Sequence, residues 1–181
     1  DMPERQILIN DKGVMTGIMP RTRLDSHKLI EEFMVLANVA AATALEAKQA
    51  PCMYRVHDRP SSERLDRSRE FLDSFGLTLP SGVANPAQLN HLLVKARDHE
   101  YSHLISEMIL RTQSQAIYSS ENIGHFGLAL ERYGHFTSPI RRYADLIVHR
   151  SLIRAYGLGD DGLDDSEIAR MDETAEHISM T

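Results

Sequence analysis

The chain has no tryptophan and a single cysteine, Cys52, among its 181 residues. One thiol cannot close an internal disulfide, and without a cluster of thiols the usual signal for a structural zinc site is missing. We therefore expect a reducing, cytoplasmic setting. No apolar run approaches the length of a membrane span and the first residues contain no apolar signal region, so we expect no membrane partner.

An excess of positive charge is also missing, because 26 acidic residues outnumber 20 lysines and arginines and leave a net charge of −6. This balance excludes a generally basic nucleic-acid coat, so a nucleic acid would have to be held by a local patch. One such patch lies between residues 132 and 154, where a single acid, Asp145, accompanies five arginines: Arg132, Arg141, Arg142, Arg150 and Arg154.

Local patterns predict a helix-rich α+β fold with an N-terminal β-hairpin and several packed helices. The hairpin turns at residues 11–13, and a long helix runs from Asp25 or Ser26 to about Gln49. The remaining predicted elements are a strand at 52–57, helices from Ser61 or Ser62 to Gly76, from Asn85, from 101 to 118, from Ser138 to Gly157 and after Asp164, and an extended segment at 124–136. Both ends interrupt a pattern, so we expect one domain, or part of one, excised from a longer protein.

The predicted long helix lacks a polar face, which is typical of a helix buried on all sides. At 100° per residue, Glu31 and Asn38 project within about 20° of each other, and Glu32 lies about 100° further round. A buried carboxylate is costly without a hydrogen-bond partner, so we expect a polar group to face Glu31 and Asn38. That group is either a structural partner, such as an arginine from elsewhere in the fold, or a ligand hydroxyl or cation.

The segment from Ser138 onward has the pattern of a helix start that can hold an anion. Ser138 is a candidate N-cap and Pro139 suits the first helical position, which places Arg141 and Arg142 in the first turn. Free main-chain N–H groups and the helix dipole favour a phosphate there, and arginine adds fork-shaped hydrogen bonds. The alternative on these residues alone is an ordinary helix with exposed arginines.

The same predicted helix carries Arg141, Asp145 and His149 at spacings of four residues, which form one strip. We expect Asp145 to orient Arg141 or His149. The alternative is an intrahelical ladder of weak ion pairs.

A zinc-peptidase pattern, H-E-x-x-H, occurs at His99, Glu100 and His103. Its flanks are charged and no third ligand stands at a recognisable spacing, so we interpret it as a solvated helix end. A zinc metallopeptidase is nevertheless an alternative enzyme class.

Several segments together resemble the ribonuclease II and ribonuclease R family of exoribonucleases, on the bacterial ribonuclease R side, and specifically the later part of the catalytic RNB domain. They are PRTR at 20–23, HKLIEEFMVLAN at 27–38, VHDRPS at 56–61, HFGL at 125–128 and TSPIRRYADLIVHR at 137–150.

The resemblance implies 3′→5′ hydrolysis of RNA from a single-stranded 3′ end, which releases nucleoside 5′-monophosphates with Mg²⁺ supporting the attack of water. It assigns the arginine beside the scissile phosphate to Arg141 and the glutamate that senses the ribose 2′-OH to Glu31. Further RNA contacts fall on the two helices: Glu32, Asn38, Thr137, Ser138, Arg142, Asp145 and His149.

One departure from the family is the absence of its metal-binding aspartate cluster, which lies early in the RNB domain. Cold-shock and S1 modules are missing as well. We therefore expect Mg²⁺ in the full-length enzyme, no metal ligand or cofactor in these 181 residues, and no cleavage by the isolated chain; no obligate protein partner is evident. A second hypothesis is a non-catalytic relative that keeps the RNB architecture as an RNA-binding module.

Overall fold

The computed structural model describes residues 5–20, 23–82 and 85–180. Residues 1–36 and 37–181 form two compact units. The first four residues and positions 21 and 22 of the PRTR segment lie outside the described residues. Within the described ranges, no helix has both the length and the apolar composition needed to cross a lipid bilayer.

The first unit contains the predicted β-hairpin. Strand β1 (Arg5–Ile9) pairs antiparallel with β2 (Met15–Pro20), with a register shift after Leu8. The Asn10 side chain closes the turn, because its Oδ1 accepts hydrogen bonds from the Lys12 and Val14 N–H groups at 3.0 Å each. Gly13 adopts a φ of 74°, which suits glycine at this position. The hairpin prediction is confirmed.

Helix α1 (Asp25–Ala47) confirms the predicted long helix, but only its second half is buried. Ala42 and Leu45 are fully enclosed in the second unit, whereas Leu29 and Phe33 are 55% and 57% exposed. The expectation that the whole helix is buried is wrong for the first half, because the first unit itself supplies no surface that covers its apolar side chains.

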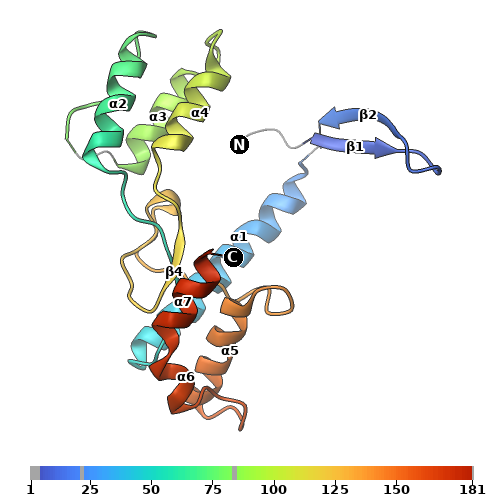
Figure 1. Ribbon diagram of the computed structural model, residues 1–181, viewed down its shortest axis with the longest axis vertical. Helices are drawn as coiled ribbons and strands as arrows, with labels where there is room; N and C mark the ends of the chain where they lie inside the picture. Colours follow the sequence, from blue (N-terminus) through green and yellow to red (C-terminus); the bar gives the residue numbers. More distant parts are fainter. Residues whose placement is uncertain (1–4, 21–22, 83–84, 181) are drawn as a thin grey trace. The chain divides into compact units, whose positions relative to one another are not determined.

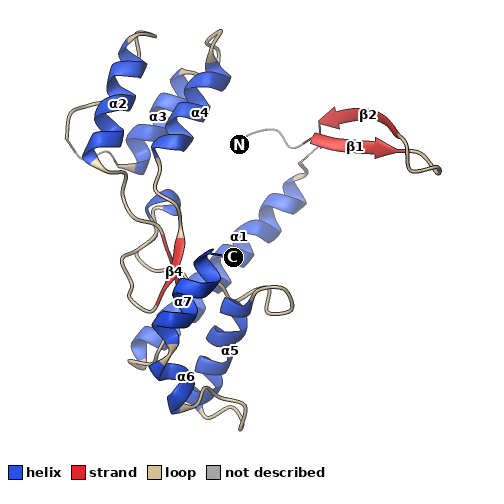
Figure 2. Cartoon of the chain, in the orientation of Figure 1, coloured by secondary structure: helices blue, strands red, loops and turns tan. Residues whose placement is uncertain are grey.

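The core of the second unit is formed by a small sheet and by helices (Figures 1 and 2). Strands β3 (Tyr54–Val56) and β4 (Ile117–Ser119) pair antiparallel. They share a core with the second half of α1, with α5 (Tyr143–Tyr156) and with α7 (Met171–Met180). The short α6 (Asp165–Ala169) begins with a capping box between Asp164 and Glu167, as predicted.

Three further helices form their own hydrophobic cluster, and Figure 1 shows them as one group. They are α2 (Ser62–Asp73), α3 (Pro86–Lys95) and α4 (Ser102–Thr112). Ser61 caps α2, and Asn85 forms a capping box at the start of α3 with Pro86 in the first turn. Both helix starts were predicted from local sequence. The extended segment predicted at 124–136 is interrupted by a one-turn segment, η1 (Phe126–Leu128).

The predicted helix from 101 to 118 is too long. It ends at Thr112, and Gln113 adopts an extended conformation with φ −63° and ψ 148°. Ile117 and Tyr118 instead pair with Val56 and Arg55 of β3. A strand partner about sixty residues away in sequence therefore overrides the helical periodicity of this segment.

Candidate functional site

The segment 136–142 forms a loop before α5 rather than the start of a helix. Helix α5 begins at Tyr143, and the N–H groups of Arg141 and Arg142 donate to the Ser138 carbonyl at 3.3 and 3.1 Å. The prediction that Ser138 caps a helix carrying both arginines in its first turn is therefore wrong. The physical reason is that Asp145, within the first turn, accepts a hydrogen bond from the Ser138 N–H at 2.7 Å and holds Ser138 outside the helix.

Asp145 is fully buried and pairs with Arg142. The Arg142 Nη2 donates to Asp145 Oδ1 at 2.8 Å, and Nε lies 2.8 Å from Oδ2. A buried carboxylate needs such partners to offset its lost hydration. We expected Asp145 to orient Arg141 or His149, and the structure corrects this to Arg142.

Asn38 holds the start of the same loop from α1. Its Oδ1 accepts hydrogen bonds from the Phe136 and Thr137 N–H groups at 2.8 and 3.2 Å, and its Nδ2 donates to the Tyr133 hydroxyl at 2.9 Å. The side chain is 3% exposed, so the polar partner predicted for Asn38 is the loop itself. Of the two alternatives, the structural partner is the one observed.

His149 completes the support of the loop. Its Nε2 donates to the Phe136 carbonyl at 2.8 Å, and its ring stacks on the Phe136 ring with centroids 4.2 Å apart. Side chains from α1 and α5 therefore fix both the N–H and the C=O groups at the start of the loop. Thr137 Oγ1 is buried and has no hydrogen-bond partner among the described residues.

The arginine patch is largely neutralised within the fold. Four of its arginines form ion pairs: Arg132 with Glu46, Arg142 with Asp145, Arg150 with Glu167, and Arg154 with Asp165. Arg141 is exposed, and in the part of the chain that the structure describes no carboxylate pairs with it. The predicted local excess of positive charge therefore rests on Arg141.

Glu31 and Glu32 lie in the exposed half of α1. Glu31 forms an ion pair with Arg23, and its side chain is 57% exposed. The expected burial of Glu31 is wrong, since the apolar residues around it are exposed as well, while the expected arginine partner is present. Glu32 is exposed.

Sequence reasoning missed a row of rings beside the loop. His57, His125, Tyr133, His135 and Tyr118 contact one another in that order with centroids 5.1 to 5.6 Å apart, each edge to face. Burial, together with neighbouring positive charges, lowers the pKa of His125 and that of His135 to about 4, so both are neutral near pH 7. The five residues are scattered between positions 57 and 135, and only His57 and His125 lie in the segments that carry the family resemblance, so the sequence offered no signal for the whole row.

The zinc-peptidase pattern does not form one helical face. His99 lies in the turn before α4, where its Nδ1 accepts a hydrogen bond from the Tyr101 N–H at 3.1 Å, whereas His103 lies inside α4. Among the described residues, no three His, Cys, Asp or Glu side chains gather as a metal site. The carboxylates of the described residues do not form a Mg²⁺ site either. No chemical step is therefore assigned to a metal ligand of this part of the chain.

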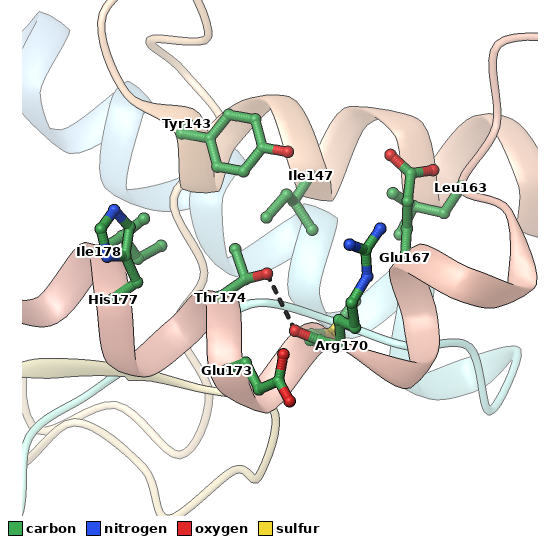
Figure 3. Close-up of a pocket in the computed structure, with 10 residues that line it drawn as sticks. Tyr143, Ile147, Leu163, Glu167, Arg170, Glu173, Thr174, His177 and Ile178 are labelled. Atoms are coloured by element: carbon green, nitrogen blue, oxygen red, sulfur yellow. Dashed lines mark hydrogen bonds between the residues drawn. The ribbon is translucent and has the colours of Figure 1, made fainter.

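A cavity of about 380 Å³ lies between α5 and the α6–α7 segment. Figure 3 shows Tyr143 and Ile147 on one side and Arg170, Thr174 and His177 on the other. None of the loop residues 136–142 lines this cavity. It is therefore separate from the candidate site, although Tyr143 directly follows the loop in sequence.

Comparison with known proteins agrees with this architecture. Residues 1–157 match the family model described as RNB domain. The chain is 45% identical over 150 residues to "Ribonuclease R" of Vibrio cholerae, which covers 82% of this chain and 18% of that protein. The chain thus spans about a fifth of the length of this relative.

Solved structures of several proteins also resemble this chain, and two of them are instructive. "Mycoplasma genitalium RNase R in complex with ribose methylated single-stranded RNA" has a TM-score of 0.86 and 27% identity, covering 99% of this chain and 29% of that one. The "Structure of yeast Ssd1, a pseudonuclease" has a TM-score of 0.71 and 23% identity over 88% of this chain and 20% of that one, a likeness that concerns the fold alone. The match to the family model covers most of the chain, from the hairpin to the end of α5, and the chain therefore belongs to the RNB domain family.

Proposed function

We propose that this chain is the later part of the catalytic domain of a longer 3′→5′ exoribonuclease that hydrolyses RNA to nucleoside 5′-monophosphates. The observation that carries the proposal is the state of Arg141. Its neighbours in the basic patch are neutralised by carboxylates, whereas Arg141 stands exposed on a loop whose main chain is held by Asn38 and Asp145.

Arg141 acts at the scissile phosphate in this proposal. A guanidinium offers a planar fork of N–H groups that can bind two phosphate oxygens at once. Charge accumulates on those oxygens in the transition state, so a guanidinium fixed in place before the reaction lowers the barrier without reorganisation. Asn38, Arg142, Asp145 and His149 then serve RNA indirectly, because their polar groups hold the loop that presents Arg141.

Glu31 recognises the ribose in the same proposal. A carboxylate that accepts a hydrogen bond from a 2′-OH distinguishes RNA from DNA. The ion pair with Arg23 supports this role, since it orients the carboxylate. Glu32, Thr137 and Ser138 are further proposed contacts, and the partnerless hydroxyl of Thr137 is a donor available to a phosphate if the loop shifts.

Mg²⁺ would be held by residues outside the described part of this chain, and the isolated chain is then inactive. When bound in the full-length enzyme, the metal supplies an activated water and neutralises charge on the leaving oxygen. The residues of this chain position the substrate and stabilise the charge that develops in the transition state.

The test compares full-length enzyme carrying Arg141→Ala or Arg141→Lys with the wild type on labelled single-stranded RNA with Mg²⁺. We expect Arg141→Ala to lower kcat by about 10²–10³-fold with nearly unchanged RNA affinity. A collapse of affinity would instead make Arg141 an anchoring contact. Clear cleavage by the isolated chain would contradict the placement of the metal site, and RNA binding by an intact full-length protein without cleavage would favour the non-catalytic module.

A further inference from the structure

Arg55 lies in the middle of three extended segments, the last of which leads into the Arg141 loop. Its position in β3 is directly opposite Tyr118 of β4. On the other side, the Arg55 N–H donates to the Tyr133 carbonyl at 2.8 Å, and Tyr54 bridges to Gly134. The chain then passes through His135 to the loop, so backbone pairing ties Arg55 to the segment that carries Arg141.

The guanidinium of Arg55 lies over the Tyr118 ring, with its central carbon 4.6 Å from the ring centroid. The Tyr118 hydroxyl in turn forms a 2.9 Å hydrogen bond with His135 Nδ1. Stacking on an aromatic face fixes the plane of a guanidinium while leaving its N–H edge able to bind an anion. No carboxylate pairs with Arg55 among the residues that the structure describes, and the side chain is partly buried.

The surroundings of Tyr118 have more positive than negative charge. Arg55, Arg142 and Arg141 all act electrostatically on its hydroxyl, and Asp145 opposes them. Asp145 is committed to Arg142, and His125 and His135 are neutral because burial lowers the pKa of each to about 4. Arg55 and Arg141 are therefore two guanidiniums that have no carboxylate partner among the described residues.

We propose that Arg55, stacked on the Tyr118 ring, binds an RNA phosphate near the 3′ end other than the scissile phosphate at which Arg141 acts. This inference rests on the proposed function. A single small anion would satisfy one of the two cations, whereas a polynucleotide satisfies both with successive phosphates. The role of Arg55 is binding rather than transition-state stabilisation.

The test measures affinity of the full-length protein for a single-stranded RNA oligonucleotide in EDTA, across a range of salt concentrations. The affinity falls with salt, and loss of one phosphate contact makes the plot of log K against log salt less steep by about 0.7. We expect this change for Arg55→Gln together with about tenfold weaker binding. Arg55→Lys, which keeps the charge, should retain the slope. Arg55→Met, whose apolar stem can still cover Tyr118, is the second variant should the glutamine variant unfold.

Lys48 provides the matched control, because its ammonium lies 5.0 Å from the centroid of the Tyr156 ring and forms the other cation–π pair of the described residues. Lys48→Gln should leave both slope and affinity unchanged. An equal change of slope in this control, or no change in either Arg55 variant that folds, would overturn the proposal.

A second readout places the contact on the RNA. Oligonucleotides with one uncharged methylphosphonate at successive positions should bind the wild type less well when the Arg55 phosphate is replaced, and that loss should vanish in Arg55→Gln. The position should differ from that of the scissile phosphate, at which Arg141 acts in the proposed function; these are the two positions compared. Coincidence of the two positions would refute separate phosphates, whereas failure of the wild type to cleave RNA would refute the proposed function itself.

Discussion

Asp145 connects two points of one loop: its Oδ1 accepts from the Ser138 N–H at 2.7 Å, and the same carboxylate pairs with the Arg142 guanidinium at 2.8 Å. A single buried acid thereby sets the path of the chain on both sides of Pro139 to Arg141. The exposed arginine owes its position to a residue that it does not touch.

Replacement of Asp145 should therefore destabilise the fold and lower turnover together. Asp145→Ala leaves Arg142 unpaired in a site where its side chain is 21% exposed, and we expect a loss of about 3 kcal/mol in unfolding free energy. Urea unfolding of the full-length protein measures it. Arg154→Gln, which breaks the exposed pair with Asp165, is the control and should cost less than about 1 kcal/mol. Equal losses in the two variants would contradict the special role of Asp145.

Asn38 should be replaceable by aspartate but not by alanine. Asn38→Ala leaves the Phe136 and Thr137 N–H groups buried without acceptors, at about 1–3 kcal/mol each, and should lower kcat with a smaller effect on KM. Asn38→Asp keeps both acceptor bonds, and the Tyr133 hydroxyl can turn to donate to the carboxylate. Steady-state kinetics on single-stranded RNA should give kcat values that fall in the order wild type, Asn38→Asp, Asn38→Ala. An aspartate variant as poor as the alanine variant would show that the acceptor bonds are not what matters.

Glu31→Ala should relax the preference for RNA over DNA, because it removes the proposed acceptor for the 2′-OH. The measurement is the ratio of kcat/KM for matched RNA and DNA oligonucleotides. Glu31→Gln keeps an acceptor oxygen without the charge and should show an intermediate ratio. Glu32→Ala alters the neighbouring exposed carboxylate and should change the ratio less. Unchanged discrimination in Glu31→Ala would refute the role.

Stability should fall as the pH drops from about 6.5 to about 4, because burial lowers the pKa of His125 and His135 to about 4. In that window the unfolded chain binds protons that the folded chain does not, so the unfolding free energy declines with falling pH. Above pH 6.5 these two histidines are neutral in both the folded and the unfolded chain, so their contribution to the unfolding free energy no longer changes with pH. Melting temperatures between pH 7.5 and pH 4 of the wild type and of His135→Gln test this. The variant should show a shallower decline, and parallel curves would contradict the lowered pKa of His135.

Features governed by neighbours in sequence could be predicted. The hairpin turn at Asn10 to Gly13, the caps at Ser61, Asn85 and Asp164, and the end of α5 at Gly157 each depend on side chains within a few residues. The family resemblance likewise singled out the segment around Arg141.

Features governed by distant partners could not be predicted. Ser138 has the side chain of a helix cap, but its N–H donates to Asp145 seven residues further on, and α5 starts only at Tyr143. Ile117 continues a helical periodicity, but Val56 pairs with it as a strand. The first half of α1 carries exposed apolar side chains such as Leu29 and Phe33, since burial depends on a covering surface that periodicity cannot reveal.

The loop before α5 has already committed most of its main-chain donors. The amides of Phe136, Thr137, Ser138, Arg141 and Arg142 all have acceptors within the protein, and Pro139 has no N–H to offer. A nest of backbone amides, the device by which many proteins cradle phosphate, is therefore foreclosed at these positions. In the proposed function, phosphate recognition at these positions therefore depends on side chains, above all on the planar guanidinium of Arg141.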